Sequence, residues 1–242
     1  SNASRGLGDV YKRQINDASQ LLQGKVAGLT IYNRGGNPNA GSVIRLRGLS
    51  TIGANASPLV VVDGVVGASL GNVDPSDIET INVLKDASAA AIYGSRGSSG
   101  VILVTTKSGG IGATEISYNG QFTTSGVLNQ IDVMSPGEFV AAGGRDLGSQ
   151  TDWLDEVTRD AFSMIHNLSA SGGNGKSSYR VSANLRENEG ILLNSGFDQF
   201  NTRLNFTTSA LDDKLKIDFS SSFTKRDQQN GFNESLRYAT LY

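Results

Sequence analysis

Apolar and polar residues alternate with a period of two along most of the second half of this chain. In the segment at 176–187, for example, Tyr179 and Val181 alternate with Arg180 and Ser182. Such alternation predicts β-strands with one apolar and one polar face. Strands of roughly nine to thirteen residues are long enough to cross a bilayer when they are tilted. The pattern predicts five strands, at 115–124, 164–171, 176–187, 199–207 and 214–226.

The links between these predicted strands alternate in length. The first spans 125–163 and the third 188–197, whereas the second is limited to 172–175 and the fourth to 211–213. Bacterial membrane barrels have short turns on the periplasmic side and longer loops outside. If the first strand runs outward, every short link falls on the periplasmic side. The parity of the links therefore favours the start of a barrel.

The long first link contains two helix-start signals. Ser135 is followed three residues later by Glu138, which is a capping box. Thr151 is a candidate cap for a helical turn at 152–158. We therefore expect two short helices in this link.

The first half of the chain mixes short strands with helical turns, which is typical of a small mixed α/β domain. Asp17 is a candidate cap for a helix through Leu22, and Asp74 followed by Pro75 predicts one further helical turn. Strands are predicted at 29–32, 42–48 and 59–62.

Residues 79–107 form the best-defined unit of this half. Strands at 80–85 and 100–107 flank an Ala-rich helix that begins after Asp86 and ends at Gly94. Residues 101–104 are all apolar, which is typical of a strand covered on both faces. By itself, such a strand–helix–strand unit is compatible with many α/β proteins.

Composition narrows the function classes. The chain has 21 Lys and Arg against 23 Asp and Glu, so it lacks the basic excess expected of a nucleic-acid-binding protein. Its 242 residues include no Cys and a single His, which leaves no disulfide framework, no thiolate chemistry and no Ser-His-Asp triad or multi-histidine metal site of familiar type. Residues 170–177 approach a phosphate-binding loop, but a strand is predicted after them where that loop requires a helix. We expect no cofactor and no enzyme activity.

Residues 1–14 are expected to lie outside the fold, because Ser1-Asn2-Ala3 resembles the remnant of a cleaved tag and the following residues lack periodicity. The predicted fold class is then α+β: a small mixed α/β domain at 15–112, followed at 113–242 by an antiparallel meander of about five strands. Because closed barrels need at least about eight strands, we expect this chain to be a truncated N-terminal fragment.

Four motifs give the chain a resemblance to a known family. They occur in order: LLQGKVAGL at 21–29, SVIRLRG at 42–48, PLVVVDGV at 58–65, and VLKDASAAAIYGSRGSSGVILVTTK at 83–107. Together they resemble the plug domain of SusC/RagA-type TonB-dependent outer-membrane transporters. TDW at 151–153 and HNLSASGG at 166–173 are also similar to this family.

The resemblance implies a plug that gates a 22-stranded outer-membrane barrel. It implies import of glycan or peptide fragments, driven by the TonB complex, with a SusD-like surface lipoprotein as a lid and outer-membrane lipid around the barrel. The TonB-contacting box is expected to lie outside this chain. The Gly- and Asn-rich loops at 33–41, 51–57 and 67–72 are candidates for the substrate-facing apex of the plug.

A second interpretation stays open at this point. Strands with one apolar face also build soluble β-sandwiches, in which the apolar face points inward. The alternative function is therefore a carbohydrate- or protein-binding sandwich module fused to a small α/β domain. Dependence on detergent would favour the barrel, and a monomer that melts cooperatively in plain buffer would favour the sandwich.

Charged side chains of the first domain are the candidate functional residues. We expect some of them to pair with barrel-wall carboxylates and thereby seat the plug, whereas the plain alternative is local or solvated charge. Neutralising Arg47 and Arg96 in a full-length transporter should then change transport or channel leak, and unchanged uptake and conductance would contradict the idea. The candidates for seating or gating are Arg45, Arg47, Asp63, Lys85, Asp86 and Arg96; the structural turn glycines are Gly48, Gly64, Gly94, Gly97 and Gly100.

Overall fold

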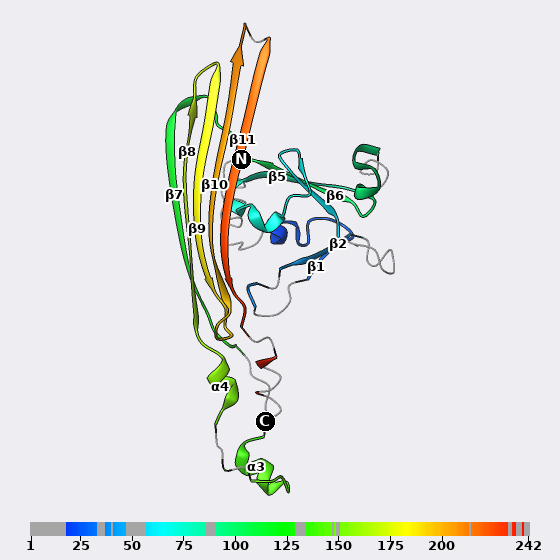
Figure 1. Ribbon diagram of the computed structural model, residues 1–242, viewed down its shortest axis with the longest axis vertical. Coiled ribbons are helices and arrows are strands. Elements are labelled where there is room, and N and C mark those ends of the chain that lie inside the picture. The colour runs from blue at the N-terminus through cyan, green and yellow to red at the C-terminus, as the bar shows by residue number, and fades with distance from the viewer. Residues whose placement is uncertain are drawn as a thin grey trace.

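The chain folds into a small N-terminal domain and a long curved sheet in a computed structural model (Figure 1). The structure describes residues 18–32, 37–39, 41–46, 57–85, 91–128, 134–146, 148, 151–212, 214–231, 234–235 and 239. Asp17, Arg47, Gly48, Asp86 and the predicted tag at 1–14 lie outside these residues, as do parts of the loops at 33–41 and 51–57.

The N-terminal domain contains a four-stranded mixed sheet in the order β4-β3-β6-β5. Its strands are β3 (Leu59–Val62), β4 (Val65–Val66), β5 (Ile78–Leu84) and β6 (Val101–Thr106). A separate antiparallel pair joins β1 (Leu29–Tyr32) to β2 (Val43–Leu46). The described part of the domain also contains the 3-10 turns η1 (Ala18–Leu22), η2 (Leu70–Asn72), η3 (Pro75–Asp77) and η4 (Gly94–Gly97).

The two strands of the 79–107 unit lie side by side and antiparallel, while β6 also pairs in parallel with β3. Strand β6 is thus central, and Val101, Ile102 and Val104 are at most 2% exposed, which confirms the prediction from its continuous apolar run. Helix is assigned only at 91–93 among the described residues of the predicted Ala-rich helix, and it continues as the turn η4.

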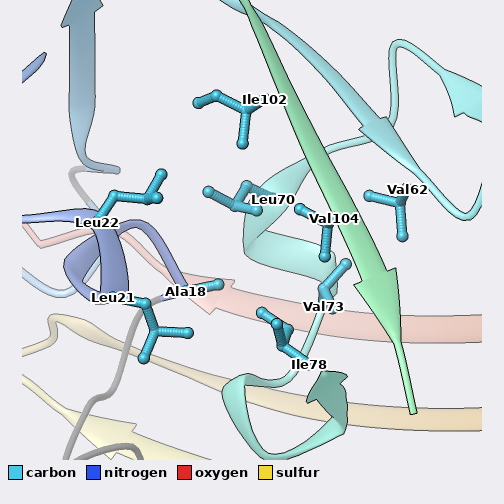
Figure 2. Close-up of a cluster of buried hydrophobic side chains, with 9 residues drawn as sticks. All are labelled: Ala18, Leu21, Leu22, Val62, Leu70, Val73, Ile78, Ile102 and Val104. Atoms are coloured by element: carbon cyan, nitrogen blue, oxygen red, sulfur yellow. The ribbon is translucent and has the colours of Figure 1, made fainter. Parts of the chain in front are cut away.

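A core of nine buried side chains ties the early turns to the central strands (Figure 2). Leu21 and Leu22 of η1 contribute from one side, and Leu70, Val73 and Ile78 contribute from the segment around η2 and η3. Their burial, about 1.5–3 kcal/mol for each large aliphatic side chain, holds the short elements together. The remaining members are Ala18, Val62, Ile102 and Val104.

The second half forms a five-stranded antiparallel sheet in sequence order. Its pairing leaves β7 and β11 as the two edges of the sheet within the described residues. The meander predicted from the period-two pattern is therefore confirmed, although the strands are longer than the pattern indicated. They are β7 (Gly112–Ser125), β8 (Ala161–Gly173), β9 (Ser177–Glu189), β10 (Gly196–Ala210) and β11 (Leu215–Gln229).

The two faces of this sheet have opposite surroundings. The N-terminal domain lies against its concave side (Figure 1), where it bonds to the polar face of β9 and β10. The apolar face points the other way and is exposed; Ile116 and Phe223, for example, are 72% and 58% exposed. In a soluble sandwich the apolar face would be the buried one. The barrel-type arrangement is therefore the one observed.

Short and long links alternate as predicted. The links at 174–176 and 211–214 are short, whereas 190–195 is longer and 126–160 is the longest. In Figure 1 the two short links lie at one end of the sheet, and the long link extends beyond the other end. No helix among the described residues is long and apolar enough to cross a membrane.

The long link contains the two expected helices. Helix α3 (Pro136–Ala141) begins at Ser135 with a complete capping box to Glu138, as predicted. Helix α4 (Trp153–Val157) is capped by Asp152, whose carboxylate accepts from the backbone of Leu154 and Asp155. The prediction of Thr151 as the cap was wrong by one residue, because the neighbouring carboxylate takes the same role.

Candidate functional site

The main contact between the domain and the sheet is built on one helical turn, η3. Asp77 closes this turn, and its carboxylate accepts hydrogen bonds from Ser182 Oγ at 2.9 Å and Asn184 Nδ2 at 2.8 Å. Arg180 Nη2 lies 3.3 Å from the other carboxylate oxygen. Three consecutive inward-facing side chains of β9 thus converge on a single carboxylate.

Asp74 begins the same turn and extends the contact by one more position of β9. Its Oδ1 accepts from the backbone of Ser76 at 2.8 Å, which caps the turn. Its Oδ2 accepts from Arg186 Nη2 at 2.9 Å. One aspartate therefore both starts the turn and fixes it to the sheet. We call Asp74, Asp77, Arg180, Ser182, Asn184 and Arg186 the β9 anchor.

A second contact centres on Asp63, in the tight turn between β3 and β4. Asp63 and Gly64 both have positive φ, 48° and 85°, as a two-residue hairpin turn requires. The Asp63 carboxylate accepts from Thr106 N and Oγ at 2.8 and 2.7 Å and from Arg203 Nη1 at 2.8 Å. The turn is therefore fixed both to β6 and to the sheet.

Strand β10 supports this second contact where the chain leaves the domain. Asn205 Nδ2 donates to Thr106 Oγ at 3.1 Å and to the carbonyl of Lys107 at 2.8 Å. We call Asp63, Thr106, Arg203 and Asn205 the β10 anchor. It holds the end of β6 just before the chain continues into β7.

The early part of the domain contacts the sheet through hydrogen bonds that pair no opposite charges. Asn39 Nδ2 donates to the carbonyls of Gly196 and Gln229 at 2.8 and 2.7 Å. Arg226 Nη2 donates to Asn39 Oδ1 at 3.5 Å, and Gln199 Nε2 donates to the Gly71 carbonyl at 3.3 Å. Within the sheet, the guanidinium of Arg226 also lies 3.8 Å from the ring centroid of Phe197. These contacts position the domain without adding a buried carboxylate.

Burial makes the two aspartates of η3 energetically important. The side chains of Asp74 and Asp77 are 3% and 5% exposed, and their Arg partners are 10% and 14% exposed. Removing both charges of such a pair is often nearly neutral, whereas removing one partner leaves an uncompensated buried charge. The β9 anchor therefore adds little net stability. Its main effect is to fix one position of the domain relative to the sheet.

The sequence-predicted candidates lie in different places. Asp63 is in the β10 anchor, Lys85 Nζ donates to the Ala27 carbonyl at 2.6 Å within the N-terminal domain, and Arg45 lies in β2 opposite Thr30. Arg96 is exposed beside Gly67. Arg47 and Asp86 are outside the described residues.

The signs of the observed pairs are the reverse of the expectation. We expected cations of the domain to meet carboxylates of the sheet, but the observed pairs join aspartates of the domain to Arg180, Arg186 and Arg203 of the sheet. Neither Arg45 nor Arg96 forms an ion pair with a described residue.

Of the predicted turn glycines, Gly64, Gly94 and Gly100 have positive φ, and Gly97 lies buried in η4 without it. Gly100 is the most constrained, because an added Cβ would lie 2.3 Å from Leu46 Cδ2. Gly48 is outside the described residues. Within the described part of the chain, no three His, Cys, Asp or Glu side chains are grouped to hold a metal ion.

Comparisons with known proteins agree with this architecture. Residues 8–101 match the family model described as TonB-dependent Receptor Plug Domain. The chain is 39% identical to the TonB-dependent receptor SusC of Bacteroides thetaiotaomicron over 96% of its own length and 24% of that protein's. It is 41% identical to a TonB-dependent receptor of Formosa agariphila, over 76% of this chain and 19% of the relative.

Solved structures show the same arrangement. The RagAB peptide importer in its closed-closed state superposes with a TM-score of 0.80 at 26% identity, covering 92% of this chain and 30% of that one. The siderophore receptor PirA from Pseudomonas aeruginosa shares the fold alone, with a TM-score of 0.58 at 20% identity, over 90% of this chain and 34% of that one. The chain spans about a quarter of the length of the first curated relative it matches.

Proposed function

Because this chain belongs to the SusC/RagA-type family of TonB-dependent receptors, we propose that it is the plug and first wall strands of an outer-membrane nutrient importer. In this proposal residues 15–112 are the plug, and 113–242 begin the barrel wall. The protein is a transporter, so its mechanism needs no catalytic residue. Gating consists of movement of the plug against the wall.

The observation that carries the proposal is the way in which the plug is held. Its carboxylates are bonded to the polar, inward face of the wall, while the apolar face is left outward for lipid. A plug bonded to the lumen of a membrane barrel blocks solute flow. A pull on the plug can release it only by separating polar partners that water can rehydrate afterwards.

The family also supplies the proposed partners and orientation. We place the short links on the periplasmic side and the long link with α3 and α4 outside, as in other bacterial barrels. The TonB complex would supply the pull, and a SusD-like surface lipoprotein would cover the outer mouth. The substrate would be a glycan or peptide fragment. The similar RagAB structure is described as a peptide importer, which supports the peptide.

The test is uptake by cells that make the full-length transporter containing this chain. Labelled oligosaccharides and oligopeptides would be offered to energised cells, to cells without TonB, and to cells treated with a protonophore. Uptake of one class that requires both TonB and the proton gradient is the expected result. Equal accumulation in all three cell types would contradict the proposal.

A further inference from the structure

The plug contacts neighbouring wall strands very unequally. On β9, the four consecutive inward positions of the β9 anchor all bond to the plug. On β11, two strands away, the plug bonds near one end of the strand, where Asn39 meets Arg226 and Gln229. The inward positions Ser220, Ser222 and Thr224 of β11 instead line a cavity. From this asymmetry we infer that the transport passage opens between plug residues 62–73 and strand β11, while η3 stays attached to β9. The inference rests on the proposed function.

The cavity lies between plug and wall and has a volume of about 350 Å³. Asp63 and Arg203 of the β10 anchor form one of its boundaries. Its other wall-side residues are the three hydroxyl-bearing residues of β11, and its plug-side residues include Val65, Ser69 and Asn72. Solvent-sized space thus already separates the plug from the wall on this side.

The chemistry of the cavity suits an uncharged, hydrogen-bonding solute. Hydroxyl and amide groups line it from Ser69, Asn72, Ser222 and their neighbours, and its only charged groups, Asp63 and Arg203, neutralise each other at 2.8 Å. The apolar Val65 and Val73 give it one non-polar flank. Such a surface offers many weak hydrogen bonds that exchange readily, and it has no group that would bind the solute tightly.

The part of the plug that faces this cavity is also its weakest part. Strand β4 has two residues, lies at the edge of the plug sheet and pairs only with β3 among the described strands. Val65 and Val66 are 65% and 41% exposed, so moving β4 uncovers little additional apolar surface. Local openings of this kind occur where few buried contacts have to be broken.

Movement of the plug away from β9, on the opposite side, would require far more free energy. Lifting η3 from β9 separates Asp74 from Arg186 and Asp77 from Arg180, and all four of these charged side chains are at least 86% buried. Both pairs lie where water does not reach, so their partners have to separate before water can solvate either charge. A pull on the plug therefore widens the β11 side before it frees the β9 side.

The experiment compares two cross-links in the full-length transporter, using a flexible bis-maleimide. The natural sequence of this region has no cysteine, so introduced thiols are the only targets here. The first variant, S69C with S222C, bridges the cavity. The second, S76C with S178C, bridges η3 and β9 through two half-buried positions, and Ser178 is an inward position of β9 outside the β9 anchor. For each variant, TonB-dependent uptake is measured before and after linking, with the mono-functional maleimide on the same variant as the chemical control.

Linking S69C to S222C is expected to reduce uptake to the level of de-energised cells. Linking S76C to S178C is expected to leave the uptake of that variant where it stood before linking. Loss of uptake with both links would show that the whole plug leaves the barrel. Uptake that persists with both links would show that the passage lies elsewhere. Either result overturns the inference. If the transporter without substitutions shows no TonB-dependent uptake, the proposed function itself has failed.

A labelling experiment gives an independent measurement. In the un-energised transporter, a small water-soluble thiol reagent is expected to modify S222C readily, because Ser222 is exposed and lines the cavity. The same reagent should leave S182C unmodified, because Ser182 is 2% exposed. Equal protection of both thiols would overturn the inference. The amount of each variant in the outer membrane, measured on the same cells, corrects for folding.

Discussion

Asp77 and Asn184 are 107 residues apart in the chain, yet a hydrogen bond of 2.8 Å joins their side chains, and the two residues as a whole are 3% and 2% exposed. This bond, with those from Ser182 and Arg180, joins the plug to the second half of the chain at a point closed to water. Because the carboxylate is the shared acceptor of three donors, it is the most sensitive position in the interface.

Replacing Asp77 with Asn is therefore expected to loosen the plug without unfolding it. The substitution preserves the shape but leaves the mostly buried Arg180 without its counter-charge, which costs about 3–5 kcal/mol. The expected result is a raised channel conductance of the purified full-length transporter in planar bilayers. Glu79→Gln, at an exposed position of β5, is the matched control and should conduct like the natural protein. Equal conductance of both variants would contradict the role of Asp77.

A second prediction concerns the pair of Asp63 and Arg203, where two substitutions separate the effects of backbone strain and of charge on stability. Asp63 has φ of 48°, a conformation that Asn adopts well and β-branched residues avoid. Asp63→Asn should keep the turn and the bond from Thr106 N, but lose the ion pair with Arg203 and the acceptor for Thr106 Oγ. Asp63→Val should lose all of these bonds and also strain the turn by roughly 1–2 kcal/mol. Thermal melting of the full-length protein in detergent should therefore order the variants as natural, Asn, Val.

The control for this pair is the exposed ion pair between Lys225 and Asp227, whose side chains are 67% and 68% exposed. Lys225→Gln should change stability by no more than about 0.5 kcal/mol, because exposed pairs contribute little. A larger loss from this control than from Asp63→Asn would show that burial does not decide the strength of these pairs.

The sequence predicted the strands well because their signal is local. A period of two is visible within a single segment, and the alternation of Tyr179, Arg180, Val181 and Ser182 already assigns each side chain to a face. The choice between a barrel and a sandwich needed the structure, since both share that alternation. It was decided by where the plug lies, on the polar face of the sheet.

The anchors were missed because their partners are distant in the sequence. Asp74 was predicted as a helix cap, and it is one through Oδ1, but Oδ2 bonds to Arg186, 112 positions away. A capping aspartate and an anchoring aspartate look the same in a local window. Two inward arginines, Arg180 and Arg186, on an otherwise neutral polar face were the available signal that carboxylates would lie opposite.

Gly100 supplies a prediction about the plug itself. Its φ is 90°, and a Cβ there would lie 2.3 Å from Leu46 Cδ2 and 3.3 Å from the Leu84 carbonyl oxygen. Gly100→Ala should therefore force the Leu46 side chain to move and place Ala in a left-handed backbone conformation, which destabilises the plug by roughly 1–3 kcal/mol. Gly41→Ala, where a Cβ meets nothing within 4 Å, is the control. Faster hydrogen exchange of residues 101–106 in the Gly100 variant alone is the expected result; identical exchange in both would contradict it.

Helix α3 in the long link between β7 and β8 gives a pH-dependent prediction. The backbone N–H and then the hydroxyl of Ser135 donate to Glu138, which lowers the pKa of that carboxyl below its ordinary value. Because the pKa is lower in the folded helix than in the unfolded chain, this stabilisation is complete above the unfolded pKa and is lost as pH falls through the folded value. Hydrogen exchange of residues 136–142 should therefore accelerate in acid.

Two variants of α3 test this cause. Ser135→Ala removes the hydroxyl that caps Glu138 N, so exchange in α3 should be faster at every pH. Glu138→Gln keeps a side chain that can accept from Ser135 N but does not ionise between pH 3 and pH 7, so the acid acceleration should disappear while the helix persists. Acid acceleration that survives in Glu138→Gln would assign the effect to another group.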